Sequence, residues 1–229
     1  MCEEFSHLKH FVACWLFPFY IIFHRTMSTY KLTYFPVKAL AEPIRFILSY
    51  MDKEFEDIRF EKENWPTIKP SMPFGKVPVL EVDGIQLHQS TAITRYFGKE
   101  AGIAGKDNWE ALQIDIAVDT IHDLRQAISS FWYETDENVK EKKRNEVLKD
   151  VVPFYLNKLD ELVKTNGGYL ANSALSWGDL YFIAISDYLS HMAGIDIFEN
   201  HPNLQSLKDT VLALPKIKAW IEKRPKSDL

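Results

Sequence analysis

The sequence predicts an α/β domain followed by an all-helical domain, and three observations support this fold class. Strand-like and helix-like segments alternate from residue 30 to about residue 99. A strong β-hairpin signal lies among them. After Gly102 only helical patterns remain, with apolar residues three or four positions apart. We expect domains at residues 27–102 and 107–229, joined by a short connection.

The first half of the α/β domain is expected to run strand, helix, strand. Residues 30–34 combine β-branched and aromatic side chains, and residues 55–60 alternate apolar with charged ones, so both are strand candidates. Residues 40–50 carry apolar side chains at helical spacing. Pro43 is tolerated there because the first turn of a helix needs no N–H at that point.

The second half is expected to be a loop, a hairpin and a helix. Residues 65–74 contain three prolines and predict the loop. Asp83-Gly84 separates two short strand-like runs and supplies the positive-φ pair that a tight hairpin turn demands. Ser90 is placed to cap a helix that runs to about Lys99.

The second domain begins with a helix from Trp109 that carries a long apolar stripe. A charged helix is expected over residues 138–163, with Gly167-Gly168 as its stop. Ser176 and Asp179 have the spacing of a capping box ahead of an apolar helix. Two short helices are expected at the end, over 203–214 and 217–223.

Composition excludes several classes of function. The chain has 229 residues, of which 46% are hydrophobic and 26% charged, as in an ordinary globular protein with a sizeable core. A net charge of −5, with no basic run, argues against nucleic-acid binding. Cys2 and Cys14 are the only cysteines, too few for a disulfide framework or a thiolate zinc site.

Residues 1–26 are expected to be an N-terminal extension that is not part of the fold. The apolar run 11–23 is too short to span a bilayer and contains Pro18. A signal peptide would have a basic start, where this chain has Glu3 and Glu4. We expect Met27 to be the usual start, with a targeting segment as the alternative, and the body after it to be cytoplasmic.

The segment 73–80 (PFGKVPVL) is typical of a thioredoxin-like domain. Many proteins of that architecture use a cysteine near the end of the first strand, where this chain has Tyr34. A phenol cannot be a redox nucleophile, but it can donate a hydrogen bond to a thiolate. This exchange favours activation of a bound thiol over disulfide chemistry.

Other side chains suggest that the thiol belongs to a short peptide. Val77-Pro78 opens a strand, and a cis bond there would leave the backbone of Val77 free to pair with an extended peptide. Gln89 and Ser90 open a helix, whose free N–H groups suit a carboxylate. Trp65 and Lys69, four residues apart, suit a second carboxylate.

Each feature has a structural alternative when it is taken alone. Tyr34 could be a solvated strand residue, Pro78 an ordinary edge-strand proline, and Ser90 simply a helix cap. Asp123 lies in an otherwise apolar helix, where most acidic residues are merely solvated. Together these features describe a ligand with carboxylates at both ends, a peptide backbone in the middle and a thiol facing Tyr34, which is the chemistry of glutathione.

Six segments resemble the sigma class of cytosolic glutathione S-transferases, and they look closest to arthropod members. They are 31–35 (KLTYF), 41–45 (AEPIR), 72–78 (MPFGKVP), 87–90 (LHQS), 118–120 (VDT) and 176–179 (SWGD). The resemblance covers residues 27–229 almost without interruption. It implies a thioredoxin-like glutathione-binding domain followed by a helical domain that contributes the pocket for a hydrophobic substrate.

The resemblance also implies residue roles. Tyr34 would hold the glutathione thiolate, and Asp123 would reach the γ-glutamyl end from the partner subunit of a homodimer. The other residues implied along glutathione are Trp65 and Lys69 at the glycyl carboxylate, Val77 at the cysteinyl backbone with Lys76 alongside, and Gln89 with Ser90 at the γ-glutamyl end. No metal is expected.

The implied activity is conjugation of glutathione to hydrophobic electrophiles, with lipid-peroxidation products and hydroperoxides as candidates. The pocket candidates, which could equally be core or dimer-interface residues, are Phe35, Leu40, His122, Phe131, Trp132 and Tyr133. Vertebrate sigma enzymes that make prostaglandin D2 carry an arginine at the place of Leu40 and an acid at that of His122. Prostaglandin isomerisation is therefore the runner-up, and a non-catalytic lipophile-binding or structural protein is a further alternative.

Overall fold

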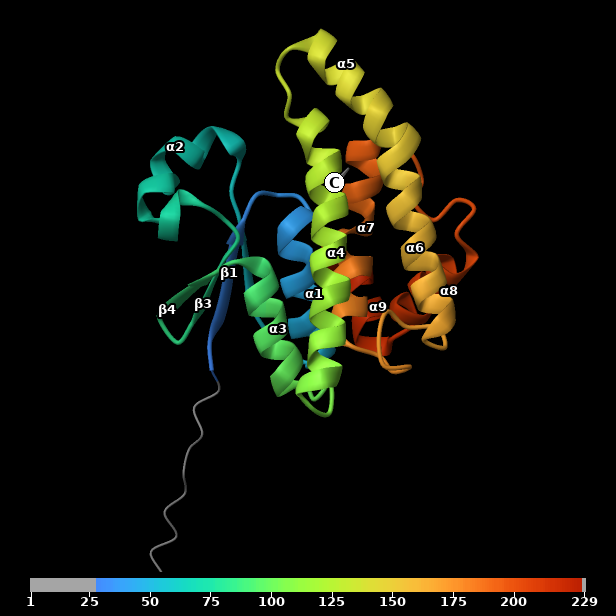
Figure 1. Cartoon of the computed structure of the whole chain (residues 1–229). Coiled ribbons are helices and arrows are strands. Elements are labelled where there is room, and N and C mark those ends of the chain that lie inside the picture. The colour runs from blue at the N-terminus through green and yellow to red at the C-terminus, as the bar shows by residue number, and fades with distance from the viewer. Residues whose placement is uncertain (1–27, 228–229) are drawn as a thin grey trace, which may run out of the picture.

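A computed structural model describes residues 28–227 of the chain (Figure 1); the expected extension over residues 1–26 lies outside them. The strands are β1 (Tyr30–Tyr34), β2 (Glu56–Arg59), β3 (Val79–Val82) and β4 (Ile85–His88). The helices are α1 (Glu42–Tyr50), α2 (Trp65–Ile68), α3 (Ser90–Glu100), α4 (Asn108–Trp132), α5 (Glu137–Glu146), α6 (Val152–Thr165), α7 (Trp177–Ala193), α8 (Pro202–Leu212) and α9 (Pro215–Lys223). The expected α/β part followed by a helical part is confirmed.

The four strands form one mixed sheet in the order β2-β1-β3-β4. β1 runs parallel to β2 and antiparallel to β3, and β3 pairs with β4 across the Asp83-Gly84 turn. Leu32 at the centre of β1 is fully buried, facing Leu80 of β3 in the register. Figure 1 shows α1 and α3 between this sheet and the helices α4 and α7.

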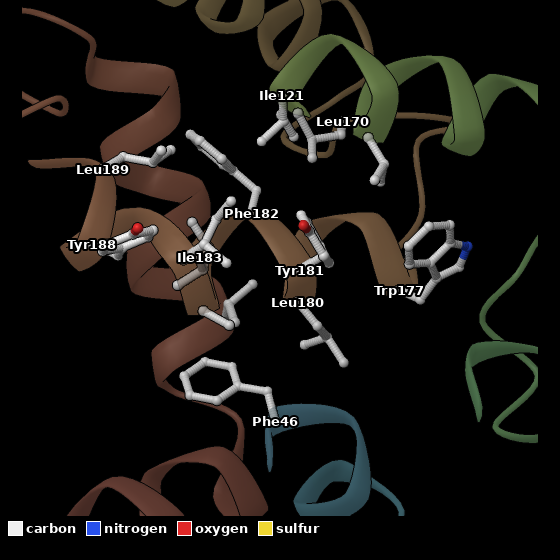
Figure 2. Close-up of a cluster of buried hydrophobic side chains, with 14 of the residues drawn as sticks. Phe46, Ile121, Leu170, Trp177, Leu180, Tyr181, Phe182, Ile183, Tyr188 and Leu189 are labelled. Atoms are coloured by element: carbon white, nitrogen blue, oxygen red, sulfur yellow. The ribbon is translucent and has the colours of Figure 1, made fainter. Parts of the chain in front are cut away.

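The core is centred on α7, whose side chains are buried nearly all round. Figure 2 shows Phe46 of α1 and Ile121 of α4 approaching this helix from different sides. A helix that is apolar on every face is stable only when neighbours cover every face. Here α1, α3, α4 and α8 all contact α7, so this helix joins the α/β part to the helical part.

Three expected details differ in the structure. The segment 65–74 is not an open loop but α2 followed by two short 3₁₀ turns at Lys69–Ser71 and Pro73–Gly75. Each turn has a proline at its first or second position, where the missing N–H costs nothing. The prolines therefore start new turns here.

The expected charged helix over 138–163 is divided by a π-helical segment at Val147–Val151, labelled η5. Pro153 follows in the first turn of α6. Proline cannot donate to the preceding turn, and its ring clashes with the carbonyl four residues earlier. A wider local turn accommodates both effects, so the helix changes its pitch without ending.

Ser90 is not the cap of α3. Gln89 occupies the N-cap position with φ 71°, and no side chain caps this end. The predicted capping box of α7 is confirmed: Asp179 accepts from Ser176 N at 2.7 Å and Oγ at 2.7 Å. It also accepts from Leu170 N at 2.8 Å, and its side chain is fully buried.

We expect Asp179→Ala to lower the free energy of unfolding by about 2–4 kcal/mol, because it removes a cap and leaves buried backbone N–H groups of Leu170 and Ser176 unsatisfied. Urea unfolding followed by circular dichroism at one protein concentration measures the loss. Asp107 is the matched control, since it caps α4 through Trp109 N and Glu110 N at an exposed site. Equal losses for the two alanine variants would contradict the importance of burial.

Candidate functional site

Tyr34 ends β1 with its side chain almost fully buried, at 6% exposure. The backbone N–H of Leu40 donates a hydrogen bond to its phenolic oxygen. Burial raises the pKa of the Tyr34 phenol to about 12, so the group keeps its proton at neutral pH. Because Leu40 already supplies a donor to this oxygen, the hydroxyl proton of Tyr34 is available to an acceptor in front of it.

The chain between Tyr34 and Leu40 makes a tight reversal before α1. Ala39 has φ 35°, in the left-handed region that residues with a Cβ rarely adopt. Residues Ala39–Ala41 then form a short 3₁₀ turn that leads into α1. This strained conformation directs the Leu40 N–H back to the strand end.

A cavity of about 340 Å³ is bordered by Leu40, whereas Tyr34 itself is not among its lining residues. Its lining residues are Leu40, Phe74, Lys76, Val77, Pro78, His88, Gln89, Ser90 and Arg125. Five predicted site residues, from three segments far apart in the sequence, are thus brought to one place. The Val77–Pro78 peptide bond is cis.

One wall of the cavity is the N-terminus of α3. The first N–H groups of any helix have no partner within the helix, and the helix dipole makes this end electropositive. Gln89, in its positive-φ conformation, and the mostly buried Ser90 lie at this end and line the cavity. Together with Lys76 they suit a negatively charged group.

Trp65 and Lys69 stand on the neighbouring segment rather than in the lining of the cavity. The ring of Trp65 stacks on Phe60 at 5.9 Å and meets Phe35 edge-on at 5.6 Å. Lys69 folds alongside Gly75, directly before Lys76. Phe35, a pocket candidate, thus holds the segment that carries the predicted glycyl-carboxylate residues.

The other pocket candidates occupy different surroundings. Phe131 is 1% exposed and belongs to the core, so it has no surface to offer a substrate. Trp132 is half-buried against His191, with ring centroids 5.2 Å apart. Tyr133 is exposed, and its hydroxyl lies 2.6 Å from that of Tyr188 on α7.

His122 is not among the residues that line the cavity, and it belongs to a polar cluster between helices. Its Nε2 lies 2.7 Å from the Tyr181 hydroxyl and 2.9 Å from the Thr91 hydroxyl. Burial, helped by the nearby Arg125, lowers its pKa. We read His122 as a link between α4, α7 and the start of α3. Asp123 beside it is exposed on the outer face of α4.

Two residues near Tyr34 are not predicted as site residues from the sequence. Arg125 lines the cavity, and its Nε is buried without a hydrogen-bond partner within the described residues. A signal for it exists, because Arg125 falls four residues after Ile121 and three before Ile128, on the apolar stripe of α4. Tyr188 has no such signal, since it is one aromatic among many on α7.

Residues 28–227 contain no helix long and apolar enough to cross a membrane. The same residues hold no group of three or more His, Cys, Asp or Glu side chains that could bind a metal ion.

Two family models describe most of the chain. The N-terminal domain of glutathione S-transferase matches residues 28–99, and the C-terminal domain matches residues 122–224. Glutathione S-transferase S1 of Drosophila melanogaster is 48% identical over 201 residues, which cover 88% of this chain and 81% of that protein. The chain belongs to the glutathione S-transferase family, which uses glutathione as co-substrate.

Relatives with another name are also similar. Hematopoietic prostaglandin D synthase of Gallus gallus is 42% identical over 202 residues, covering 88% of this chain and 99% of that protein. The structure of prostaglandin synthase D of Nilaparvata lugens superposes with a TM-score of 0.84 at 54% identity, covering 87% of this chain and all of that one. Membership of the sigma class stays a prediction.

Tyr34 should remain protonated throughout the working range of the protein. The ultraviolet difference between the native protein and Tyr34→Phe is expected to contain no tyrosinate signal below about pH 11, because burial raises the pKa of this phenol. A spectrophotometric titration measures it. A tyrosinate midpoint near the ordinary value of about 10 would contradict the proposed donor role.

Proposed function

We propose that this protein conjugates glutathione to hydrophobic electrophiles, with Tyr34 as the residue that stabilises the thiolate. The observation that carries the proposal is the buried, protonated phenol of Tyr34, which accepts from the N–H of Leu40, a residue that lines a cavity with an electropositive wall. Such a hydroxyl donates a hydrogen bond to an anionic acceptor and keeps its proton. A thiolate sulfur at this point would receive that hydrogen bond.

The energetics fit this role. A free thiol with a pKa of about 8.5 is only a few per cent ionised at neutral pH. Lowering that pKa by about two units requires about 2.7 kcal/mol of preferential stabilisation of the thiolate. One hydrogen bond to a charged acceptor supplies about 1.5–3 kcal/mol. Tyr34 and the electropositive surroundings of the cavity therefore suffice without a general base.

The remaining contacts follow the length of glutathione. The Val77 backbone would pair with the cysteinyl residue, and Gln89 with Ser90 would hold the γ-glutamyl carboxylate at the α3 N-terminus. Trp65 and Lys69 would hold the glycyl carboxylate, with Lys76 alongside. These assignments are supported by the shared cavity and by the adjoining position of the Trp65 segment.

The polar groups next to Tyr34 favour an electrophile that has an oxygen near its reacting atom. Tyr133 and Tyr188 share a hydrogen bond, and Arg125 stands close enough to influence Tyr34 electrostatically. These donors suit the carbonyl of a lipid-peroxidation aldehyde, whose oxygen gains negative charge as the thiolate sulfur adds to the conjugated carbon. With a hydroperoxide, the thiolate sulfur would attack the terminal oxygen, which breaks the O–O bond, releases an alcohol and leaves a glutathione sulfenic acid. A second glutathione would then attack that sulfur, release water and form the disulfide.

Prostaglandin D synthesis is the second candidate activity. Similarity to proteins named as prostaglandin D synthases favours it. Leu40, which lines the cavity without the cationic group expected in the vertebrate enzymes, weighs against it. We also infer a cytoplasmic location, since the body of the chain after Met27 contains no cysteine.

We further propose that the active unit is a homodimer. Large apolar side chains stand exposed on neighbouring parts of the surface: Ile85 on β4, Tyr96 on α3, and Leu112 and Ile116 on α4. The Arg95–Asp115 ion pair joins α3 to α4 at 2.8 Å, so these side chains belong to one region. Exposed apolar side chains that gather in one region favour an interface. Asp123 falls seven residues after Ile116, hence on the same helix face, where it would reach the partner's site.

Conjugation to 1-chloro-2,4-dinitrobenzene tests the assignment of Tyr34. We expect Tyr34→Phe to lower kcat/KM about 10²-fold at pH 6.5 and to move the apparent pKa of bound glutathione up toward about 8.5, because the thiolate loses its donor. Unchanged activity would move the catalytic role to another residue. Native protein that binds glutathione without turnover would favour the lipophile-binding alternative.

Mixing two impaired variants tests the shared site. Tyr34→Phe lacks the thiolate donor, and Asp123→Ala is expected to raise the KM for glutathione about tenfold, the cost of one charge-assisted contact. A mixed dimer regains one complete site, with Tyr34 from one subunit and Asp123 from the other. Activity at low glutathione should therefore rise on mixing. A strictly additive rate, or a monomer in sedimentation, would contradict the dimer.

A further inference from the structure

A cluster of charged side chains is buried beneath the loop that follows Tyr34. Glu42 and Arg45, one turn apart on α1, are both fully buried, and Arg45 Nη1 lies 3.0 Å from Glu42 Oε2. Arg45 Nε also donates to Asp57 of β2 at 3.1 Å, and Arg59 binds the other oxygen of Asp57 at 2.8 Å. Charges hidden from water persist only where partners compensate each of them.

The C-terminal helix α9 supplies the other partners. Trp220 donates from Nε1 to Glu42 Oε1 at 2.8 Å, and Arg224, directly after α9, donates to the same oxygen at 2.7 Å. These residues lie more than 170 positions from Glu42 in the chain. Glu42 thus receives three donors, two of them from the far end of the sequence.

Arg45 connects the charged cluster to the loop after β1. Its Nη1 donates to the carbonyl of Val37 at 2.9 Å and to that of Lys38 at 3.4 Å. The next residue is Ala39, held at φ 35°, and the one after it is Leu40, whose N–H contacts Tyr34. A strained backbone conformation persists only when its surroundings fix it. Arg45 is the side chain that hydrogen-bonds to the two residues before the strained Ala39.

We propose that Trp220 and Arg224 are positioning residues for thiolate formation: acting through Glu42 and Arg45, they fix the backbone that aims the Leu40 N–H at the Tyr34 oxygen. The inference rests on the proposed function of Tyr34. Neither residue lines the 340 Å³ cavity, so neither belongs to the binding surface described above.

Two physical effects act in the same direction. With Leu40 N–H in place, the hydroxyl of Tyr34 is oriented toward the sulfur. The cluster also contains three guanidinium groups (Arg45, Arg59 and Arg224) but only two carboxylates (Glu42 and Asp57), so it is net cationic. A net positive charge beneath the site favours the thiolate. The other groups that influence Tyr34 are Arg125 of α4, Tyr133 directly after α4, and Tyr188 of α7.

The test measures the ionisation of bound glutathione, by thiolate absorbance, and the pH profile of kcat. Arg224→Gln is expected to raise the apparent thiol pKa by about half to one unit, the usual effect of one displaced charge. Below that pKa kcat should fall about three- to tenfold. Native and variant kcat should converge at high pH, where the thiol ionises unaided, and the KM for glutathione should stay unchanged.

Trp220→Phe removes a single donor to Glu42 and keeps an aromatic ring in place. We expect the same direction of change with a smaller shift, while Arg224→Lys should restore much of the native profile. Lys218→Gln is the matched control, because it removes a positive charge from an exposed position of the same helix. Circular dichroism and a thermal unfolding midpoint establish that each variant is folded at the assay temperature.

Three results would overturn the proposal. They are an unchanged thiol pKa in folded Arg224→Gln and Trp220→Phe, a kcat loss equal at every pH, and an equal shift in Lys218→Gln. Different results would contradict the proposed function of Tyr34. They are native protein that does not lower the pKa of the bound glutathione thiol, or a Tyr34→Phe variant that leaves this pKa unchanged.

Discussion

The ion pair between Glu42 and Arg45 is the interaction on which the arrangement of this molecule depends. Both side chains are cut off from water, and a buried pair of this kind contributes little net stability compared with apolar packing. Removing one partner, by contrast, strands a charge and is strongly destabilising. The pair therefore fixes one particular arrangement of its neighbours: β2 through Asp57, the loop after β1 through the carbonyls of Val37 and Lys38, and α9 through Trp220.

Those neighbours come from both halves of the chain. β1 and the 3₁₀ turn before α1 supply Tyr34 and its backbone donor. Arg125 of α4, Tyr133 at the end of α4 and Tyr188 of α7 come from the other half. The apolar helix α7 packs against α1 and α4, so the two sets of groups are held at a fixed separation. Under the proposed function, thiol activation and electrophile binding fall in different halves of the chain, and the buried core sets their distance.

Much of the fold is predictable from local sequence. The Asp83-Gly84 turn, the Ser176–Asp179 capping box and the apolar stripe of α4 each specify their element through residues close in the chain. The incorrect predictions arise where one residue type is compatible with two kinds of local structure. Prolines at 66, 70 and 73 predict a loop, yet each also suits the first turn of a helix.

The residues of the candidate site also differ in whether local sequence predicts them. Lys76, Val77, Gln89 and Ser90 carry motif signals, and they meet Leu40, predicted only as an apolar pocket candidate, at one cavity. Arg125 is visible as a charge on an apolar stripe, whereas Tyr188 and the contacts of Glu42 depend on tertiary packing. The hydrogen bond from Trp220 to Glu42 joins residues separated by most of the chain, and no local pattern encodes it.

The bond between Leu40 and Tyr34 comes from the main chain, which has an evolutionary consequence. Nineteen of the twenty amino acids carry that N–H, and only proline lacks it. Position 40 lines the cavity, so its side chain can change in size, polarity or charge while the donor to Tyr34 is retained. Under the proposed function, a substitution at position 40 other than proline can thus redirect the choice of electrophile while the donor to Tyr34 is inherited intact.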